Sequence, residues 1–482
     1  MKDLAQRAVD TAKHAGADYA DARVLRVRNQ QIQVLDLSPK SIGDRTDAGI
    51  GIRVLKDGAW GFASISRVDK RSAEKVAREA VAVAKASSLT AKNNKVKLAQ
   101  EPPHIDRFET EVEIDPFSVP IDDKLGLLLR INESILRGKD IVKAIAVCRS
   151  KHRHQFFIST EGSEIETLIT TVDATYTAVA VKGNDSQTRT FMDFPKNAGW
   201  EHINSLRLAE NAERIADQAR AKLSAEFPAE GKKDLILDPF HMSLTIHESV
   251  GHATELDRVL GYEANFAGTS FVTLDKKKDK FRYGSDIVNL VADNTLKGGL
   301  SSTGYDDEGV QCQKWDIVRK GIFQNYSSTR EVAPLAGYKR SFGSGRADSY
   351  ASLPINRIPN LSLMPGRRSA SPDDLIADIK DGIWIEGRGS WSIDQRRLNF
   401  QFGGDLFYRI KNGKKTGMLR DVIYQSITPQ FWGSVDGLTS KKYWIPCGIM
   451  NCGKGEPMQI AQMTHGSPWV RVRKVQVNRG KK

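Results

Sequence analysis

The segment HESVGH at residues 247–252 constrains this chain more than any other feature of its sequence. It places two imidazoles, which are good zinc ligands, beside a glutamate that can act as a general base. The histidines are five positions apart, which is about 140° around an ideal α-helix, so their rings could not reach one ion. A single π-turn, with hydrogen bonds from i to i+5, would bring both rings to one face. We therefore expect a metal-binding helix with a local π-turn, which Gly251 would ease.

The residues before this segment predict how the helix starts. The apolar run at 235–237 suits a buried strand, and Asp238 followed by Pro239 has the chemistry of an N-cap with proline at the first helical position. Pairs of histidines on helices are more often core or surface residues than ligands. The helix therefore needs a further ligand from elsewhere in the chain before it defines a metal site.

The third ligand has several candidates. A catalytic zinc usually has three protein ligands and one open position. No histidine follows His252 closely, so the ligand is either a carboxylate, from Glu255 or Glu263, or a thiolate. Cys452 is the candidate thiol, because it lies in a glycine-flanked loop where Lys454 would favour the ionised form.

The length of the chain and its pattern of apolar, glycine and proline residues predict an α+β protein of two domains. The 482 residues suffice for two or three domains, and a Pro- and Gly-containing segment at 227–231 marks a boundary. We expect a sheet-and-helix domain at residues 1–228, then a β-rich, glycine-punctuated domain at 229–482 that contains the HExxxH helix. In the first domain strands are expected at 19–27, 30–37, 49–55, 59–63, 142–149, 155–159 and 165–181, with helices at 1–16, 70–86, 121–137 and 205–225. In the second domain helices are expected at 372–381 and 419–427.

A second histidine pair, His152 and His154, falls between two of these expected strands. A hairpin turn at that point would place both rings beside Lys151 and Arg153. We interpret the pair as exposed turn residues rather than as metal ligands.

The net charge and the number of cysteines limit the kinds of binding partner and the cellular compartment that we expect. Lys and Arg number 72 against 59 Asp and Glu, which gives a net charge of +13 and a pI near 9.4. These cations are spread along the chain without a basic stripe carrying interleaved aromatics, so nucleic acid is not the expected partner. No apolar run approaches the length of about 18 residues that spans a membrane. Four scattered cysteines are too few for a disulfide framework, which favours the cytoplasm.

Several further motifs occur in order along nearly the whole chain. They are GADYAD at 16–21, GIGIRV at 49–54 and WGF at 60–62, then HESVGH at 247–252, GYDDEG at 304–309, CGKG at 452–455, HGSP at 465–468 and VRV at 470–472. Together they resemble one known family, the TldD/PmbA metallopeptidases.

This resemblance implies an activity and a ligand set. It implies a zinc-dependent peptidase that holds one Zn²⁺ per chain on His247, His252 and Cys452. Glu248 then takes the role of general base. The family's members hydrolyse unfolded or extended peptides in an enclosed cleft, in peptide maturation or turnover. Their specificity is broad, so the resemblance implies no particular substrate.

The resemblance also bears on assembly. The family has subunits that retain the metal motif and subunits that lack it, so we expect a homodimer or a heterodimer with a PmbA-like homologue. Residues 1–228 would then form the substrate-cleft and dimerisation domain. The alternative is a non-catalytic scaffold or regulatory subunit that pairs with an active homologue. The intact residues of the predicted metal site argue against that alternative.

Two features of the sequence allow more than one interpretation. The donor that stabilises the tetrahedral oxyanion is either His465 or a backbone amide near Gly453. The acidic residues Asp306, Asp307 and Glu308 either line the site, bind a cation or form a solvated turn.

Overall fold

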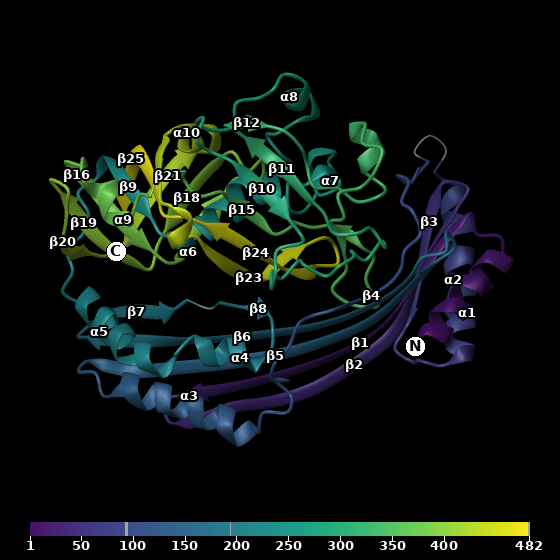
Figure 1. Cartoon of the computed structure of the whole chain (residues 1–482), viewed down its shortest axis with the longest axis horizontal. Helices are drawn as coiled ribbons and strands as arrows, with labels where there is room; N and C mark the ends of the chain where they lie inside the picture. Colours follow the sequence, from purple (N-terminus) through teal and green to yellow (C-terminus); the bar gives the residue numbers. More distant parts are fainter. Residues whose placement is uncertain (92–94, 193, 368, 481–482) are drawn as a thin grey trace.

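The computed structural model describes residues 1–91, 95–192, 194–367 and 369–480. It has the mixed α+β architecture that the sequence predicts (Figure 1). A long curved sheet is built from the first part of the chain, and the remainder is seated over its concave side. Among the described residues, every strand ladder joins strands from within one of these two parts. No helix in the described ranges is long and apolar enough to cross a membrane.

The first sheet has eight strands in the order β3-β2-β1-β5-β6-β4, with β7 and β8 also pairing with β6. All its ladders are antiparallel except the one between β4 and β6. The four central strands are long, which lets the sheet curve along its length (Figure 1). The bounds are β1 Tyr19–Leu35, β2 Ser38–Lys56, β3 Ala59–Ile65, β4 Ile105–Glu109, β5 Ile141–Ser159, β6 Glu164–Lys182, β7 Asp185–Phe191 and β8 Lys196–Asn197.

The separate strands expected at 142–149 and 155–159 are one continuous strand, β5. The predicted hairpin turn at His152 and His154 is therefore wrong. Both residues lie within β5, paired with β1 on one side and β6 on the other. A polar stretch can remain in a strand here because both edges of its backbone are hydrogen-bonded, and the ring of His154 bonds Glu166 at 2.8 Å.

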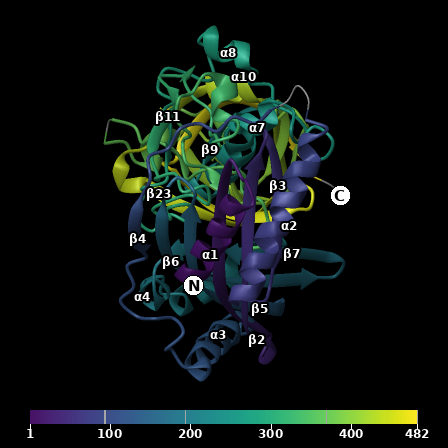
Figure 2. The same cartoon turned by 90° about the vertical axis from the view of Figure 1, so that its right-hand side faces the viewer.

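Helices cover the two ends of this sheet. At one end α1 (Lys2–His14) and α2 (Lys70–Ser88) lie side by side and bury alanine and valine side chains against β1 and β2 (Figure 2). At the other end α3 (Ile121–Leu136) and α5 (Ala212–Lys222) pack on β5 and β6.

The single helix expected at 205–225 is wrong in its first half. Helix α4 (Trp200–Ser205) ends at Ser205, and α5 begins only at Ala212. Arg207 between them has a positive φ of 48°, a conformation that stops an α-helix.

The second part of the chain is built on a nine-stranded sheet. Its order is β17-β18-β21-β25-β9-β16-β19-β20, with β22 also pairing with β25. Smaller sheets join β12-β11-β10-β15, β13-β14 and β23-β24. The bounds are β9 Gly231–Leu237, β10 Leu290–Asp293, β11 Lys314–Arg319, β12 Ile322–Phe323, β13 Gly345–Arg346, β14 Ile355–Asn356, β15 Leu361–Leu363, β16 Asp381–Glu386, β17 Trp391–Ile393, β18 Asn399–Gly403, β19 Leu406–Lys411, β20 Lys414–Leu419, β21 Val422–Ile427, β22 Val435–Leu438, β23 Ile445–Lys454, β24 Gln459–Ser467 and β25 Val470–Arg479.

Short helices in this part test two expectations. The helix expected at 372–381 begins where predicted but ends earlier, as α9 (Pro372–Ile376), and Ser371 caps it with a capping box to Asp374. The helix expected at 419–427 is wrong, because this segment holds the end of β20, a positive φ at Asp421 and then β21. Pairing of β21 with both β18 and β25 supplies the hydrogen bonds that outweigh local preference. The other short helices are α7 Leu256–Val259, α8 Leu274–Lys278 and α10 Thr428–Gly433.

Buried ion pairs join the two parts of the chain. Arg53 of β2 binds Asp21 at 2.7 Å and reaches across to Glu308 at 2.8 Å. Arg153 of β5 binds Asp307 at 2.6 Å. All of these carboxylates are almost fully buried. The acidic segment is therefore not a solvated turn, since Asp307 and Glu308 are buried and paired with arginines of the long sheet.

Asp306 has a different local role. Its Oδ1 atom accepts hydrogen bonds from the backbone N–H groups of Glu308 and Val310, both at 2.9 Å. Its Oδ2 atom accepts from the N–H of Gly345 at 2.8 Å. Asp306 thus fixes the turn that presents Asp307 and Glu308 to the long sheet.

Candidate metal centre

The helix that carries the HESVGH segment begins as the sequence predicts. After β9, the Asp238 carboxylate accepts a hydrogen bond of 2.7 Å from the backbone N–H of His241, and Pro239 is the first residue of α6 (Pro239–Ile246). Strand β9 pairs with β16 and β25 in the middle of its sheet, so the helix starts from a fixed point in the core.

The predicted π-turn is present. Residues His247–Gly251 form a π-helical turn, which leads into a 3₁₀ turn at His252–Thr254. The inserted residue brings His247 and His252 to one face, with ring centroids 4.8 Å apart. Gly251 also allows close packing here, since a Cβ atom at this position would lie 2.9 Å from two carbons of the buried Ile358 side chain.

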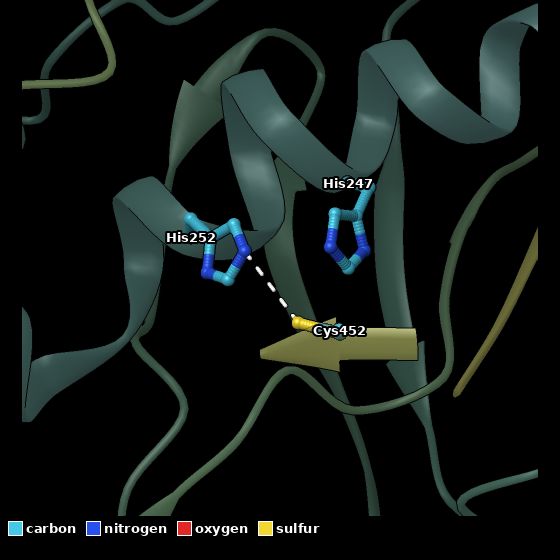
Figure 3. Close-up of side chains that lie close together, drawn as sticks. All are labelled: His247, His252 and Cys452. Carbon is cyan, nitrogen blue, oxygen red and sulfur yellow. Dashed lines mark hydrogen bonds between the residues drawn. The ribbon is translucent and has the colours of Figure 1, made fainter. Parts of the chain in front are cut away.

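The two histidines face the thiol of Cys452 (Figure 3). Potential ligand atoms of His247, His252 and Cys452 all lie within 4.8 Å of one another, and Cys452 Sγ is 3.6 Å from His252 Nε2. Cys452 comes from β23, just after an irregularity in its pairing with β24. Donors bound to zinc at about 2.0–2.3 Å are themselves about 3.3–3.8 Å apart in a tetrahedral site. The separation of 3.6 Å between Cys452 Sγ and His252 Nε2 lies in that range, and two imidazoles with a thiol are a donor set that suits zinc.

The thiol is prepared for ligation. Burial on its own would raise the pKa of Cys452, but His252 and Arg357 together more than offset this and the pKa falls below its ordinary value. The thiolate is the form that binds metal. Cys452 is thus chemically distinct from Cys148, whose thiol pKa burial raises to about 12.

A chain of hydrogen bonds sets the tautomer of His247. The carbonyl of Leu361 lies 2.9 Å from Nδ1 of His465, and Nε2 of His465 lies 2.9 Å from Nδ1 of His247. Because a carbonyl only accepts, His465 Nδ1 carries the proton and its Nε2 accepts from His247 Nδ1–H. The lone pair of His247 Nε2 then remains for a metal. Burial lowers the pKa of His247 to about 4, so the ring is neutral at neutral pH.

A carboxylate orients the second histidine. His252 Nδ1 lies 2.7 Å from Glu255 Oε2, which leaves Nε2 directed at Cys452. Lys454 is fully buried and lies 3.2 Å from the other oxygen of Glu255 and 2.7 Å from Asp257. The Glu255 carboxylate therefore holds His252 instead of taking the third ligand position that the sequence left open to it. Glu263, the other carboxylate candidate, accepts a backbone hydrogen bond from Gly455 at 3.4 Å.

Glu248, the candidate general base, pairs with one charged side chain among the residues that the structure describes. Its Oε2 atom lies 2.6 Å from Nη1 of Arg397, and its side chain is 9% exposed. Arg397 is a residue that sequence reasoning missed. It lies 149 positions away in a polar segment, and only the folding of β17 and β18 brings it to the metal helix.

The two candidates for the oxyanion donor differ in access. His465 is fully buried and both of its ring nitrogens are engaged, so it acts on His247 rather than on a substrate. Gly453 follows Cys452 in β23, is exposed and pairs with Ile460 of β24. Of the two, Gly453 alone is accessible.

Comparison with protein families gives consistent matches along the chain. The PmbA/TldA metallopeptidase domain 1 matches residues 20–84, the central domain of that family matches 114–223, and its C-terminal domain matches 230–479. A metalloprotease of Methanocaldococcus jannaschii is 31% identical over 91% of this chain and 92% of its own length. A zinc metalloprotease TldD homolog of Saccharolobus solfataricus is 24% identical over 97% of this chain and 98% of its own.

Solved structures share the fold. TldE from Thermococcus kodakarensis superposes with a TM-score of 0.76 at 16% identity, covering 98% of this chain and 99% of its own. A protein of Thermotoga maritima described as a putative modulator of a DNA gyrase superposes with a TM-score of 0.78 at 17% identity, covering 99% of both chains. At these identities the likeness concerns the fold alone.

Proposed function

The chain belongs to the PmbA/TldD family of metallopeptidases, and from that premise we propose that it is a zinc-dependent peptidase that hydrolyses unfolded or extended peptides. The observation that carries the proposal is the buried cluster of His247, His252 and Cys452 with Glu248 next to the first ligand. Homologues named as metalloproteases support peptidase activity in general. The three donors and their spacing support zinc as the metal, with one ion per chain.

The residues of the site divide the chemistry among them. A zinc ion on this triad supplies a Lewis acid that activates water and polarises the carbonyl of the peptide bond. Glu248 takes the proton from the attacking water and delivers it to the leaving amine, the exchange expected of a carboxylate general base. His465 and Glu255 keep the two imidazoles in the tautomers that leave their Nε2 atoms free.

The proposed substrate is an extended peptide bound between the two parts of the chain. A pocket of about 240 Å³ lies between the two parts of the chain, lined by residues that include Lys151, Asn197, Arg346 and Gln462. We infer that residues 1–228 form one wall of a substrate cleft and contribute to dimerisation, and that 229–482 holds the peptidase site. The partner is a second copy or a PmbA-like homologue, a proposal that the likeness to TldE supports. Four free cysteines favour the reducing cytoplasm.

Metal content tests the ligand set. The full-length protein is purified without chelators, supplied with zinc, and measured by elemental mass spectrometry beside Cys452→Ala and Cys312→Ala. About one zinc per chain in the wild type and in Cys312→Ala, with marked loss in Cys452→Ala, is the expected result. No metal in any of them would favour the alternative of a scaffold or regulatory subunit.

Activity tests the base. Glu248→Gln is expected to retain zinc and to lose cleavage of unfolded protein substrates, followed by mass spectrometry of the products. Normal cleavage by this variant would show that the general base is another group.

A further inference from the structure

A hairpin turn delivers an arginine to the metal centre. Strands β17 and β18 are joined by residues 394–398, and Arg397 in this turn has a positive φ of 62°. Such a conformation is uncommon for a residue other than glycine, and it persists where surrounding contacts over-determine it. Here it directs the Arg397 side chain from the sheet to Glu248.

The turn is held from several directions. The Asp394 carboxylate accepts hydrogen bonds from the backbone N–H groups of Leu398 at 2.9 Å and Asn399 at 3.0 Å. The hydroxyl of Thr428 donates to the carbonyl of Arg397 at 2.9 Å. These bonds fix the backbone on both sides of Arg397. They indicate that the arginine is presented in a defined position rather than on a mobile loop.

The guanidinium has more donors than the protein uses. Nη1 donates to Glu248 at 2.6 Å, while the buried Nε–H has no hydrogen-bond partner among the described residues. The side chain is 14% exposed. A buried donor without a partner calls for an explanation, and at this position a bound molecule could supply the acceptor.

Hydrolysis of a peptide bond needs a hydrogen-bond donor next to the carbonyl that water attacks. Addition of water to the scissile carbonyl places negative charge on its oxygen, and a preorganised cationic donor there stabilises the transition state. His465 is unavailable, because both of its nitrogens are engaged within the core. We propose that Arg397 is a catalytic residue that donates hydrogen bonds to the substrate carbonyl oxygen and its oxyanion while its Nη1 atom orients Glu248. The proposal rests on the peptidase function proposed above and adds to it the electrophilic group.

Kinetics of the full-length, zinc-loaded protein give the first test. Arg397→Met is expected to lower kcat by about 10²- to 10³-fold with KM changed by less than about threefold, since the lost contact strengthens in the transition state. Arg397→Lys keeps a cationic donor and should recover part of kcat. Arg396→Met is the matched control, because it removes an exposed arginine from the same turn and should leave kcat unchanged. Equal kcat for wild type and Arg397→Met would overturn the proposal.

Binding of a phosphinic peptide separates a direct contact from an effect through Glu248. Its tetrahedral anion resembles the transition state, and affinity is measured by calorimetry on the zinc-loaded protein. In a Glu248→Gln background, Arg397→Met should still weaken binding at least about tenfold. No further weakening would show that Arg397 acts only on Glu248 and would overturn the proposed contact.

The same binding measurement distinguishes this inference from the proposed function. If the wild type cleaves no peptide, the peptidase assignment fails. The comparison of phosphinic-peptide affinity between wild type and Arg397→Met then still decides the role of Arg397 toward an oxyanion. Zinc content measured in each variant must match the wild type, because Arg397 is not a ligand.

Discussion

Nδ1 of His247 lies 2.9 Å from Nε2 of His465, a residue 218 positions further along the chain. The contact fixes which nitrogen of His247 is free for metal. His465→Leu removes the acceptor and is expected to lower zinc affinity by about 10- to 100-fold, the usual effect of losing a hydrogen-bond partner of a ligating histidine. Competition with a chromophoric chelator measures this affinity directly.

His465→Gln tests the same contact with less disturbance. A glutamine carbonyl can accept from His247 Nδ1–H, so this variant should bind zinc more tightly than His465→Leu. His152→Leu in β5 serves as the control and should bind zinc as the wild type does. Equal affinity of His465→Leu and wild type would show that the tautomer of His247 is set in another way.

Packing at the π-turn gives a second prediction. A Cβ atom added at Gly251 would lie 2.9 Å from Cδ1 and Cγ2 of Ile358, closer than carbon atoms approach without a shift. Gly251→Ala is expected to cost about 1–3 kcal/mol of stability, the usual price of overpacking a core, and to weaken zinc binding because the turn shifts. Chemical unfolding and chelator competition measure the two effects.

A double-mutant cycle tests whether the contact with Ile358 causes the loss of stability in Gly251→Ala. Ile358→Ala opens the space beside residue 251, so adding Gly251→Ala to it should cost less stability than Gly251→Ala costs in the wild type. Strictly additive effects would mean that Ile358 is not the obstacle.

The sequence predicted the start of the helix that carries His247 and His252, and its π-turn, because the determinants of both are local. The N-cap at Asp238, the spacing of His247 and His252, and the adjacent Gly251 all act within about four helical turns. Strand Val422–Ile427 shows the opposite case, since distant strands β18 and β25 determine its structure. Its own residues suggested a helix.

The contacts that sequence reasoning missed have a common cause, which is that they join segments far apart in the chain. Arg397 reaches Glu248 only because a hairpin folds over the metal helix. The acidic residues Asp307 and Glu308 were singled out, but their arginine partners come from the long sheet, more than 150 positions earlier. Charge pairs between distant segments leave no periodic pattern in a sequence. The acidic residues could therefore be singled out from the sequence, but their arginine partners could not.

The junction between the two parts gives a third prediction. Arg53 is 4% exposed and its charge is shared between Asp21 and Glu308. Glu308→Gln removes one of these carboxylates from a buried network, which is expected to cost about 3 kcal/mol. Glu109→Gln is the control, because its pair with Arg107 is exposed on both sides and should contribute little. Chemical unfolding compares the two variants, and equal stabilities would contradict a structural role for the Arg53 network.

The buried His241 predicts a dependence of stability on pH. Burial lowers the pKa of His241 to about 4, against the hydrogen bond to Gly387 that favours the charged form. The unfolded chain has the ordinary value of about 6.5, so between these values it binds more protons than the folded chain. The stability that His241 contributes is therefore complete above about pH 6.5 and is lost as the pH falls toward 4, by at most about 3 kcal/mol.

Comparison of the wild type with a His241→Gln variant isolates the contribution of His241. Glutamine at position 241 can donate to the Gly387 carbonyl and accept from the Tyr424 hydroxyl, as the neutral histidine does, but it does not titrate. The free energy of unfolding of wild type minus that of His241→Gln should thus decrease from pH 7 to pH 4, since all other titrating groups cancel. The exposed His14→Gln provides the reference. A difference that stays constant across this range would show that His241 is not held neutral by the fold.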